Sequence, residues 1–128
     1  MAELGAHAGW VLLVAFILSF AYEFYRASVK EGVSRHDSRR SFLQSVPLYV
    51  VAAAVSGALI VGFNWAPVVG LVLSIGSILV SVIYYNPRIM VERSPGIIDW
   101  IEDLVFTGLL FVSSALLLYQ VLGITLLP

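Results

Sequence analysis

The chain has 128 residues, of which 60% are hydrophobic and only 12% are charged, whereas soluble domains carry about 25% charged residues. It contains no cysteine, which excludes disulfides, thiolate nucleophiles and cysteine-ligated metal centres. The net charge is −1, and no basic patch alternates with aromatic residues as in nucleic-acid binders. The composition therefore predicts an integral membrane protein and no nucleic-acid partner.

One uncharged stretch fixes the expected number of membrane helices. Residues 41–87 contain no Lys, Arg, Asp or Glu, although a single spanning helix needs only about 20 apolar residues. This stretch predicts two membrane helices joined by a turn, and the apolar segments on either side add one helix each. We expect an all-α integral membrane fold with four transmembrane helices in one domain, residues 1–128. The only charge before the first apolar run is Glu3, which is not typical of a cleavable signal peptide.

The first two helices are expected over residues 8–25 and 46–63. Trp10 lies at one end of the first helix and Tyr22 at the other, where amphipathic rings favour the membrane interface. Ser45 is a candidate cap for the second helix, with Pro47 in its first turn, where the missing N–H costs little. If the helix instead runs unbroken from Ser38, Pro47 lies inside it as a kink.

The third and fourth helices are expected over residues 67–85 and 104–126. The turn between the second and third helices is short, so the two should form a tight antiparallel hairpin, and Asn86-Pro87 should end the third. Ser94-Pro95 resembles a helix start, and the mixed segment 96–103 predicts a short interfacial helix before the fourth.

The basic residues predict the orientation. All seven Lys and Arg residues lie in loops 26–45 and 86–103, and none lies in the tails or in the second loop. Basic loops favour the cytoplasmic side of a membrane. We therefore expect both loops in the cytoplasm and both termini outside, in a multi-pass protein of the cell membrane.

Small residues at helical spacing are candidates for helix packing or for lining a pore. Close backbone approach and hydrogen bonds between helices drive association in membranes, because apolar side chains gain little by leaving lipid. Packing is the simpler interpretation, and a polar pore lined by the third-helix serines is the alternative. The candidates are Ala54, Ala58 and Gly62 in the second helix and Gly70, Ser74, Ser77 and Ser81 in the third.

Charged residues near the loops suggest contacts between the two cytoplasmic segments. Glu23 is expected to pair with Arg26, three residues on. Asp99, Glu102 and Asp103 are spaced to lie on one helix face, which suits basic partners. Together with Glu92 they could also bind a hard cation, which favours oxygen ligands. The basic loop is also suited to anionic lipids. The docking candidates are Arg26, Arg35, Arg39, Arg40, Asp99, Glu102 and Asp103, with Arg35, Arg39 or Arg40 expected against Asp99 and Glu102.

The sequence predicts no catalytic residues, no cofactor and no metal site. The two histidines, His7 and His36, lie outside the expected spans, which does not suit haem ligation within the membrane. We expect a non-catalytic subunit of a larger membrane complex that packs against other membrane-protein subunits. Respiratory and energy-converting assemblies are the candidates for that complex. A small self-associating channel or transporter is the alternative. A lipid-modifying enzyme that uses the acidic face is a third interpretation.

Overall fold

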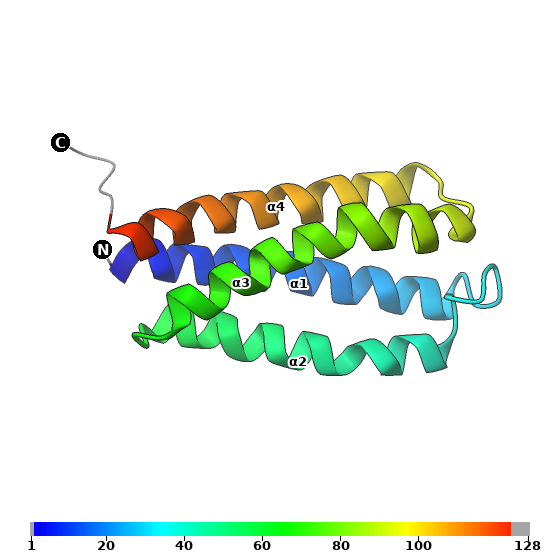
Figure 1. Cartoon of the computed structure of the whole chain (residues 1–128). Helices are drawn as coiled ribbons and strands as arrows, with labels where there is room; N and C mark the ends of the chain where they lie inside the picture. The colour runs from blue at the N-terminus through cyan, green and yellow to red at the C-terminus, as the bar shows by residue number, and fades with distance from the viewer. Residues whose placement is uncertain (1, 124–128) are drawn as a thin grey trace.

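The computed structural model describes residues 2–123 and contains only helices over that range (Figure 1). The elements in chain order are α1 (Ala2–Ser28), α2 (Arg39–Val61), α3 (Ala66–Leu79), the π-helix η1 (Val80–Met90), the 3₁₀-helix η2 (Val91–Arg93) and α4 (Ile97–Leu122). The described chain ends and the α2–α3 turn lie at one end of the bundle. The α1–α2 loop and the η2–α4 connection lie at the other, which we call the loop end.

Four helices in residues 2–123 are long and apolar enough to cross a membrane, namely 4–28, 39–61, 66–93 and 97–122. The expected all-α fold, with four helices long and apolar enough to span a membrane, is therefore confirmed over these residues. Residues 97–103 form the first turns of α4 rather than a separate interfacial helix, so that detail of the prediction is wrong. The expected end of the fourth helix at residue 126 lies outside the described residues.

The second helix starts earlier than residue 46. Ser38 has an extended backbone, and its Oγ accepts a hydrogen bond from the backbone N–H of Ser41 at 3.1 Å. This cap satisfies one of the free donors at a helix start. Pro47 consequently lies inside α2, which is the unbroken arrangement that the sequence left open.

The third helix does not end at Asn86-Pro87. The helical path continues through η1 and η2 to Arg93, with Pro87 inside the π-helical part. Local π and 3₁₀ adjustments let a membrane helix accommodate the N–H that proline lacks. The extension matters for the site described below because it carries Arg93 into the loop end of the bundle, where Tyr85 also lies.

Helix α2 lies close to α3 near their short connection and separates from it toward the loop end (Figure 1). Helix α1 packs against both α2 and α4, and α3 packs against α4, whereas α2 and α3 have few contacts. Their connection is short, but they do not form the tight hairpin that was expected (Figure 1). The packed core contains Leu12 and Phe16 of α1, Leu59 of α2, and Leu110 and Leu117 of α4.

One glycine allows α1 and α2 to approach closely. A Cβ on Gly9 would lie 2.9 Å from the backbone oxygen of Ser56 and 2.9 Å from side-chain atoms of Leu59 and Ile60. Such contacts are too short for any larger residue, so the close approach requires glycine. Small residues commonly allow such close helix packing in membranes. Gly9 lies on the first helix and was not among the predicted packing candidates.

Candidate functional site

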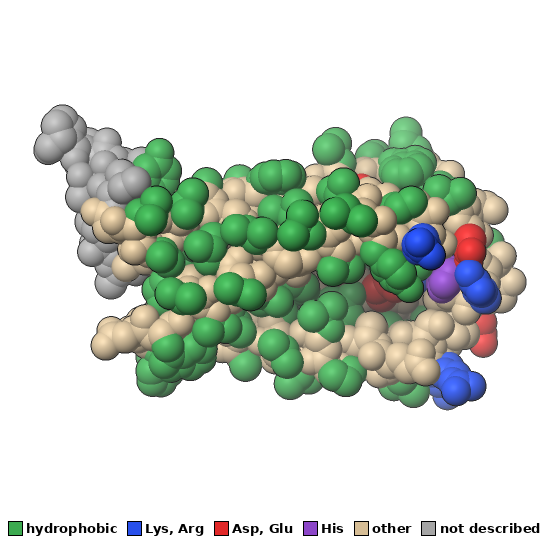
Figure 2. All heavy atoms as spheres, in the orientation of Figure 1, with side chains coloured by type: hydrophobic (Ala, Val, Ile, Leu, Met, Phe, Trp, Pro, Cys, Tyr) green, Lys and Arg blue, Asp and Glu red, His purple; other side chains and the backbone are tan. Residues whose placement is uncertain are grey.

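The separation of α2 from α3 and η1 leaves a cavity of about 610 Å³ at the loop end. Helices α2, α3 and η1 form its sides, and residues of α1 and α4 form the rest of its wall. Figure 2 shows a hollow between these helices on the visible face, with acidic side chains inside it. The hollow therefore opens at the side of the bundle, roughly perpendicular to the helix axes.

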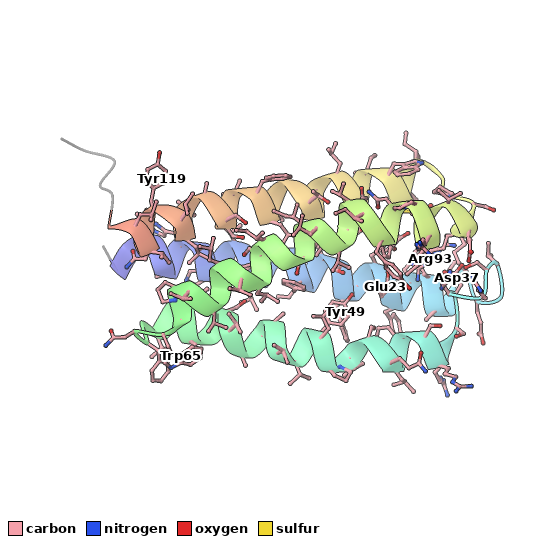
Figure 3. The ribbon with its side chains drawn as sticks, in the orientation of Figure 1. Glu23, Asp37, Tyr49, Trp65, Arg93 and Tyr119 are labelled. Carbon is pink, nitrogen blue, oxygen red and sulfur yellow. The ribbon has the colours of Figure 1, made fainter. Side chains whose placement is uncertain are left out.

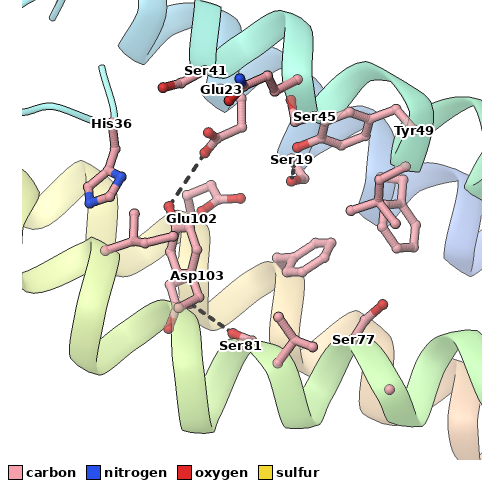
Figure 4. Close-up of a pocket in the computed structure, with 18 of the residues that line it drawn as sticks. Ser19, Glu23, His36, Ser41, Ser45, Tyr49, Ser77, Ser81, Glu102 and Asp103 are labelled. Atoms are coloured by element: carbon pink, nitrogen blue, oxygen red, sulfur yellow. Dashed lines mark hydrogen bonds between the residues drawn. The ribbon is translucent and has the colours of Figure 1, made fainter. Parts of the chain in front are cut away.

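The cavity has an apolar end and a polar end. Phe16, Val72 and Phe106 line the part that reaches toward the middle of the bundle. Between the two ends, the hydroxyls of Ser19 and Tyr49 form a hydrogen bond of 2.7 Å across α1 and α2 (Figure 4). The polar end is lined by Glu23, His36, Ser41, Gln44, Ser45, Ser77, Ser81, Tyr85, Arg93, Glu102 and Asp103.

Two carboxylates of the cavity wall have no cationic partner. Glu102 forms no hydrogen bond or ion pair with the side chains of the described residues, and it is half-buried. Asp103 accepts only long hydrogen bonds, 3.5 Å from the Ser81 hydroxyl and 3.4 Å from the Asn86 amide. Both side chains lie at the cavity in Figure 4. The wall therefore carries two carboxyl groups that have no cationic partner among the described residues.

The third acid of the wall, Glu23, is paired with Arg93. The guanidinium of Arg93 donates to both carboxylate oxygens of Glu23, at 2.8 and 2.9 Å. It also donates to the Tyr85 hydroxyl at 2.7 Å and to the backbone oxygen of His36 at 3.2 Å. Arg93 is only 2% exposed. The predicted pair of Glu23 with Arg26 is wrong, because the fork of a guanidinium from η2 holds this carboxylate instead.

Behind the cavity wall, Arg26 joins two buried aspartates. It donates to both carboxylate oxygens of Asp37, at 2.8 and 2.6 Å, and to Asp99 at 3.3 Å. Asp37 also lies 3.2 Å from Arg93 Nε, and Asp99 accepts from the Tyr22 hydroxyl and from the Gly96 backbone N–H. Figure 3 shows Glu23, Asp37 and Arg93 together at the loop end. These charges are paired as buried charges must be.

A second, exposed group links the same two segments at the surface. Arg35 donates to both oxygens of Glu92, at 2.8 and 2.7 Å, and His36 Nε2 lies 2.7 Å from the same carboxylate. The hydrogen bonds and the attraction of the Glu92 charge raise the pKa of Arg35 above its ordinary value. Because this group is exposed, it contributes less to stability than the buried pairs.

The predicted packing and pore residues do not share one environment. Ala58 is in the core and Ala54 is exposed, while Gly62 caps α2 with a left-handed backbone, φ 99°. The four candidates of the third helix divide into two groups. Gly70 faces Leu59 and Leu117, and Ser74 bonds the Ser113 hydroxyl at 2.9 Å, whereas Ser77 and Ser81 line the cavity.

The predicted docking residues also lie in different environments. The two loops do fold against each other, but through other pairs than expected. Arg26 contacts Asp99, and Arg35 contacts Glu92. Arg39 and Arg40 are exposed and form no ion pair with the described residues. The acidic residues do not form one face, because Asp99 belongs to the buried cluster while Glu102 and Asp103 face the cavity. Arg26 and Asp99 are buried, so neither offers a docking surface in this structure.

Sequence reasoning missed Asp37, Tyr85 and Arg93 as members of the site. The sequence signal that could have indicated them is that Asp37 and Arg93 lie in the charged segments beside the apolar helices. Within residues 4–123, no group of three His, Asp or Glu side chains is arranged to hold a metal ion. Comparisons with protein-family models, curated proteins and solved structures found no match.

Proposed function

We propose that this chain is a small multi-pass membrane protein that binds an amphipathic molecule in the loop-end cavity, as a transporter does. The cavity is the observation that carries the proposal. Its volume of about 610 Å³ lies in the range of about 300–1,000 Å³ that is common for small-molecule sites. The apolar end suits a hydrocarbon body, and the polar end suits a headgroup. The proposal assigns no catalytic step to the chain.

The sideways opening supports entry from the lipid. In a bundle whose helices cross a membrane, an opening between α2 and η1 faces the lipid, with its polar end at the level of the headgroups and its apolar end beside the acyl chains. Molecules that concentrate in the bilayer can then reach the site without crossing the loop end. A solute that is wholly polar has no such route, which favours amphipathic molecules over simple ions.

The subunit function expected from the sequence is the second candidate. The same opening between α2 and η1 is a place where a helix of another membrane-protein subunit, or of a second copy, would cover exposed polar groups. The proposed partners therefore include other membrane-protein subunits, and anionic lipids at Arg39 and Arg40.

Purification in mild detergent, with mass spectrometry of all proteins and lipids present, distinguishes the subunit function from the binding function. Stoichiometric unrelated chains support the subunit function.

The proposed orientation places the loop end in the cytoplasm of a cell-membrane protein, because that end holds all seven basic residues. The absence of cysteine makes this simple to test. In intact cells, an impermeant maleimide is expected to label a cysteine introduced at Asn64 and not one introduced at Arg40. Labelling at position 40 alone would reverse the orientation without affecting the binding proposal.

Placing a larger side chain inside the cavity is expected to weaken binding while leaving the fold intact. Gly76 lines the cavity, and a Cβ there would meet nothing within 4 Å, so Gly76→Leu extends a side chain into open space. The matched control is Gly108→Leu on α4, where a Cβ is equally free but which does not line the cavity. We expect Gly76→Leu to weaken binding of dodecanol in nanodiscs at least about tenfold, equivalent to about 1.4 kcal/mol.

Native mass spectrometry of the nanodisc-released protein measures the bound dodecanol. Equal binding by the wild type, Gly76→Leu and Gly108→Leu would contradict the proposal, since the alcohol would then be bound elsewhere. An equal loss in both variants would point to a general effect of leucine on the helices rather than to the cavity.

A further inference from the structure

We infer that the ligand of the loop-end cavity is an amphipathic cation, such as a primary amine with a hydrocarbon body. This inference rests on the proposed binding function and names its ligand class. The site itself rests on the cavity, and the charges on its wall determine which headgroup it accepts. Three carboxyl groups and one guanidinium line the cavity, from Glu23, Glu102, Asp103 and Arg93, and the His36 imidazole, which also lines it, is paired with Glu92.

The single guanidinium is not available to a ligand. Each terminal nitrogen of Arg93 already donates to Glu23, and one also donates to Tyr85 and the other to a backbone oxygen. Its Nε lies 3.2 Å from Asp37. An anionic headgroup would have to displace these buried partners, and it would meet the two unpaired carboxylates as well. The cavity therefore disfavours carboxylate and phosphate headgroups.

The two unpaired carboxylates favour a donor that carries positive charge. Glu102 has no hydrogen-bond partner among the described side chains, and the two bonds to Asp103 are long. An ammonium group has three N–H donors and no acceptor, which complements these acceptors. A charged group in a poorly solvated place is stabilised strongly by an opposite charge nearby. A bound cation would therefore supply the partner that both carboxylates lack.

The rest of the lining indicates an organic cation rather than a bare metal ion. The wall continues from the carboxylates past Ser77 to Val72 and Phe106, and hydrocarbon buried there would leave its contact with water. A metal ion would leave this apolar end unused. The described residues also offer no group of three carboxylate or imidazole ligands at coordinating distances.

The test compares three probes that differ only in the headgroup: dodecylamine, dodecanol and dodecanoate. The protein is held in nanodiscs of zwitterionic lipid at neutral pH, empty nanodiscs provide the partition background, and native mass spectrometry counts bound probe. For the wild type we expect dodecylamine to bind at least about tenfold more tightly than dodecanol, and dodecanoate to bind least.

The key variant is Glu102→Gln with Asp103→Asn, which keeps the shape of the wall and removes the two carboxyl groups that a cation would pair with. We expect it to bind dodecylamine and dodecanol equally, with dodecanol binding unchanged from the wild type. Retained dodecanol binding shows that the variant is folded and that its cavity is present. Glu92→Gln is the matched control, since it removes a carboxylate at the same end that does not line the cavity, and the preference for amine should persist in it.

The outcomes separate this inference from the proposed function. If wild type and Glu102→Gln/Asp103→Asn bind amine and alcohol equally, and Gly76→Leu binds both more weakly, the cavity is a binding site without preference for cations, and the inference is overturned. Tighter binding of dodecanoate than of dodecylamine would overturn it as well. If none of the probes binds the wild type above the empty nanodisc, the proposed function itself fails.

Discussion

Replacing Arg26 with methionine is expected to lower the free energy of unfolding by about 3–5 kcal/mol, the usual cost of removing one partner of a buried ion pair. Arg26 is 2% exposed, and its main partner Asp37 is 1% exposed. Methionine fills similar space but offers no donor. Asp37 would keep only Ser34 and the more distant Arg93, and Asp99 would lose its only ion-pair partner within the described residues.

Reversible unfolding in mixed micelles, followed by circular dichroism, measures this loss. The matched control is Arg40→Met, because Arg40 is exposed and forms no ion pair with the described residues. We expect the control to stay within about 0.5 kcal/mol of the wild type. A loss at Arg26 no greater than that of the control would show that the buried cluster does not stabilise the fold.

The Glu23–Arg93 pair is expected to give a large coupling energy in a double-mutant cycle. Arg93→Met alone should cost about 3–5 kcal/mol, because it leaves Glu23 without a cation in a half-buried place. Adding Glu23→Gln removes that uncompensated charge, so the double variant should recover part of the loss. The coupling should reach about 1–3 kcal/mol, as found for residues within one network.

An exposed pair from the same end of the bundle is the control for this cycle. Arg35 and Glu92 form a two-bond contact of nearly the same geometry, but their side chains are 76% and 40% exposed. Solvent screens such a pair, so Arg35→Met and Glu92→Gln should show little coupling. Equal coupling in the two cycles would mean that burial does not set the strength of the Glu23–Arg93 pair.

The helix count and the gathering of charge at one end were predictable from the sequence, because each depends on local composition. A long uncharged run specifies spans whatever they pack against. The helix ends were less predictable. Asn86-Pro87 is typical of a helix end, yet the helix continues, because a π-helical segment accommodates the N–H that proline lacks.

The partners within the site were not predictable, because they depend on how helices far apart in sequence are placed. Spacing along one helix favoured Glu23 with Arg26, but a residue 70 positions away takes that carboxylate. Periodicity likewise placed Asp99, Glu102 and Asp103 on one face. The packing of α1 against α4 assigns Asp99 to the buried cluster and the other two to the cavity.

The buried cluster also has a consequence for how the protein is made. Arg26 and Asp37 both belong to the first half of the chain and can meet as soon as α1 and the following loop leave the ribosome. The ion pair of Glu23 with Arg93 and that of Arg26 with Asp99 form later, because Arg93 and Asp99 are synthesised only after α3. A nascent chain that stops after α2 therefore carries a carboxylate at the membrane border with its cation still missing. The ion pairs of the first two helices are thus complete only when the second half of the chain is present.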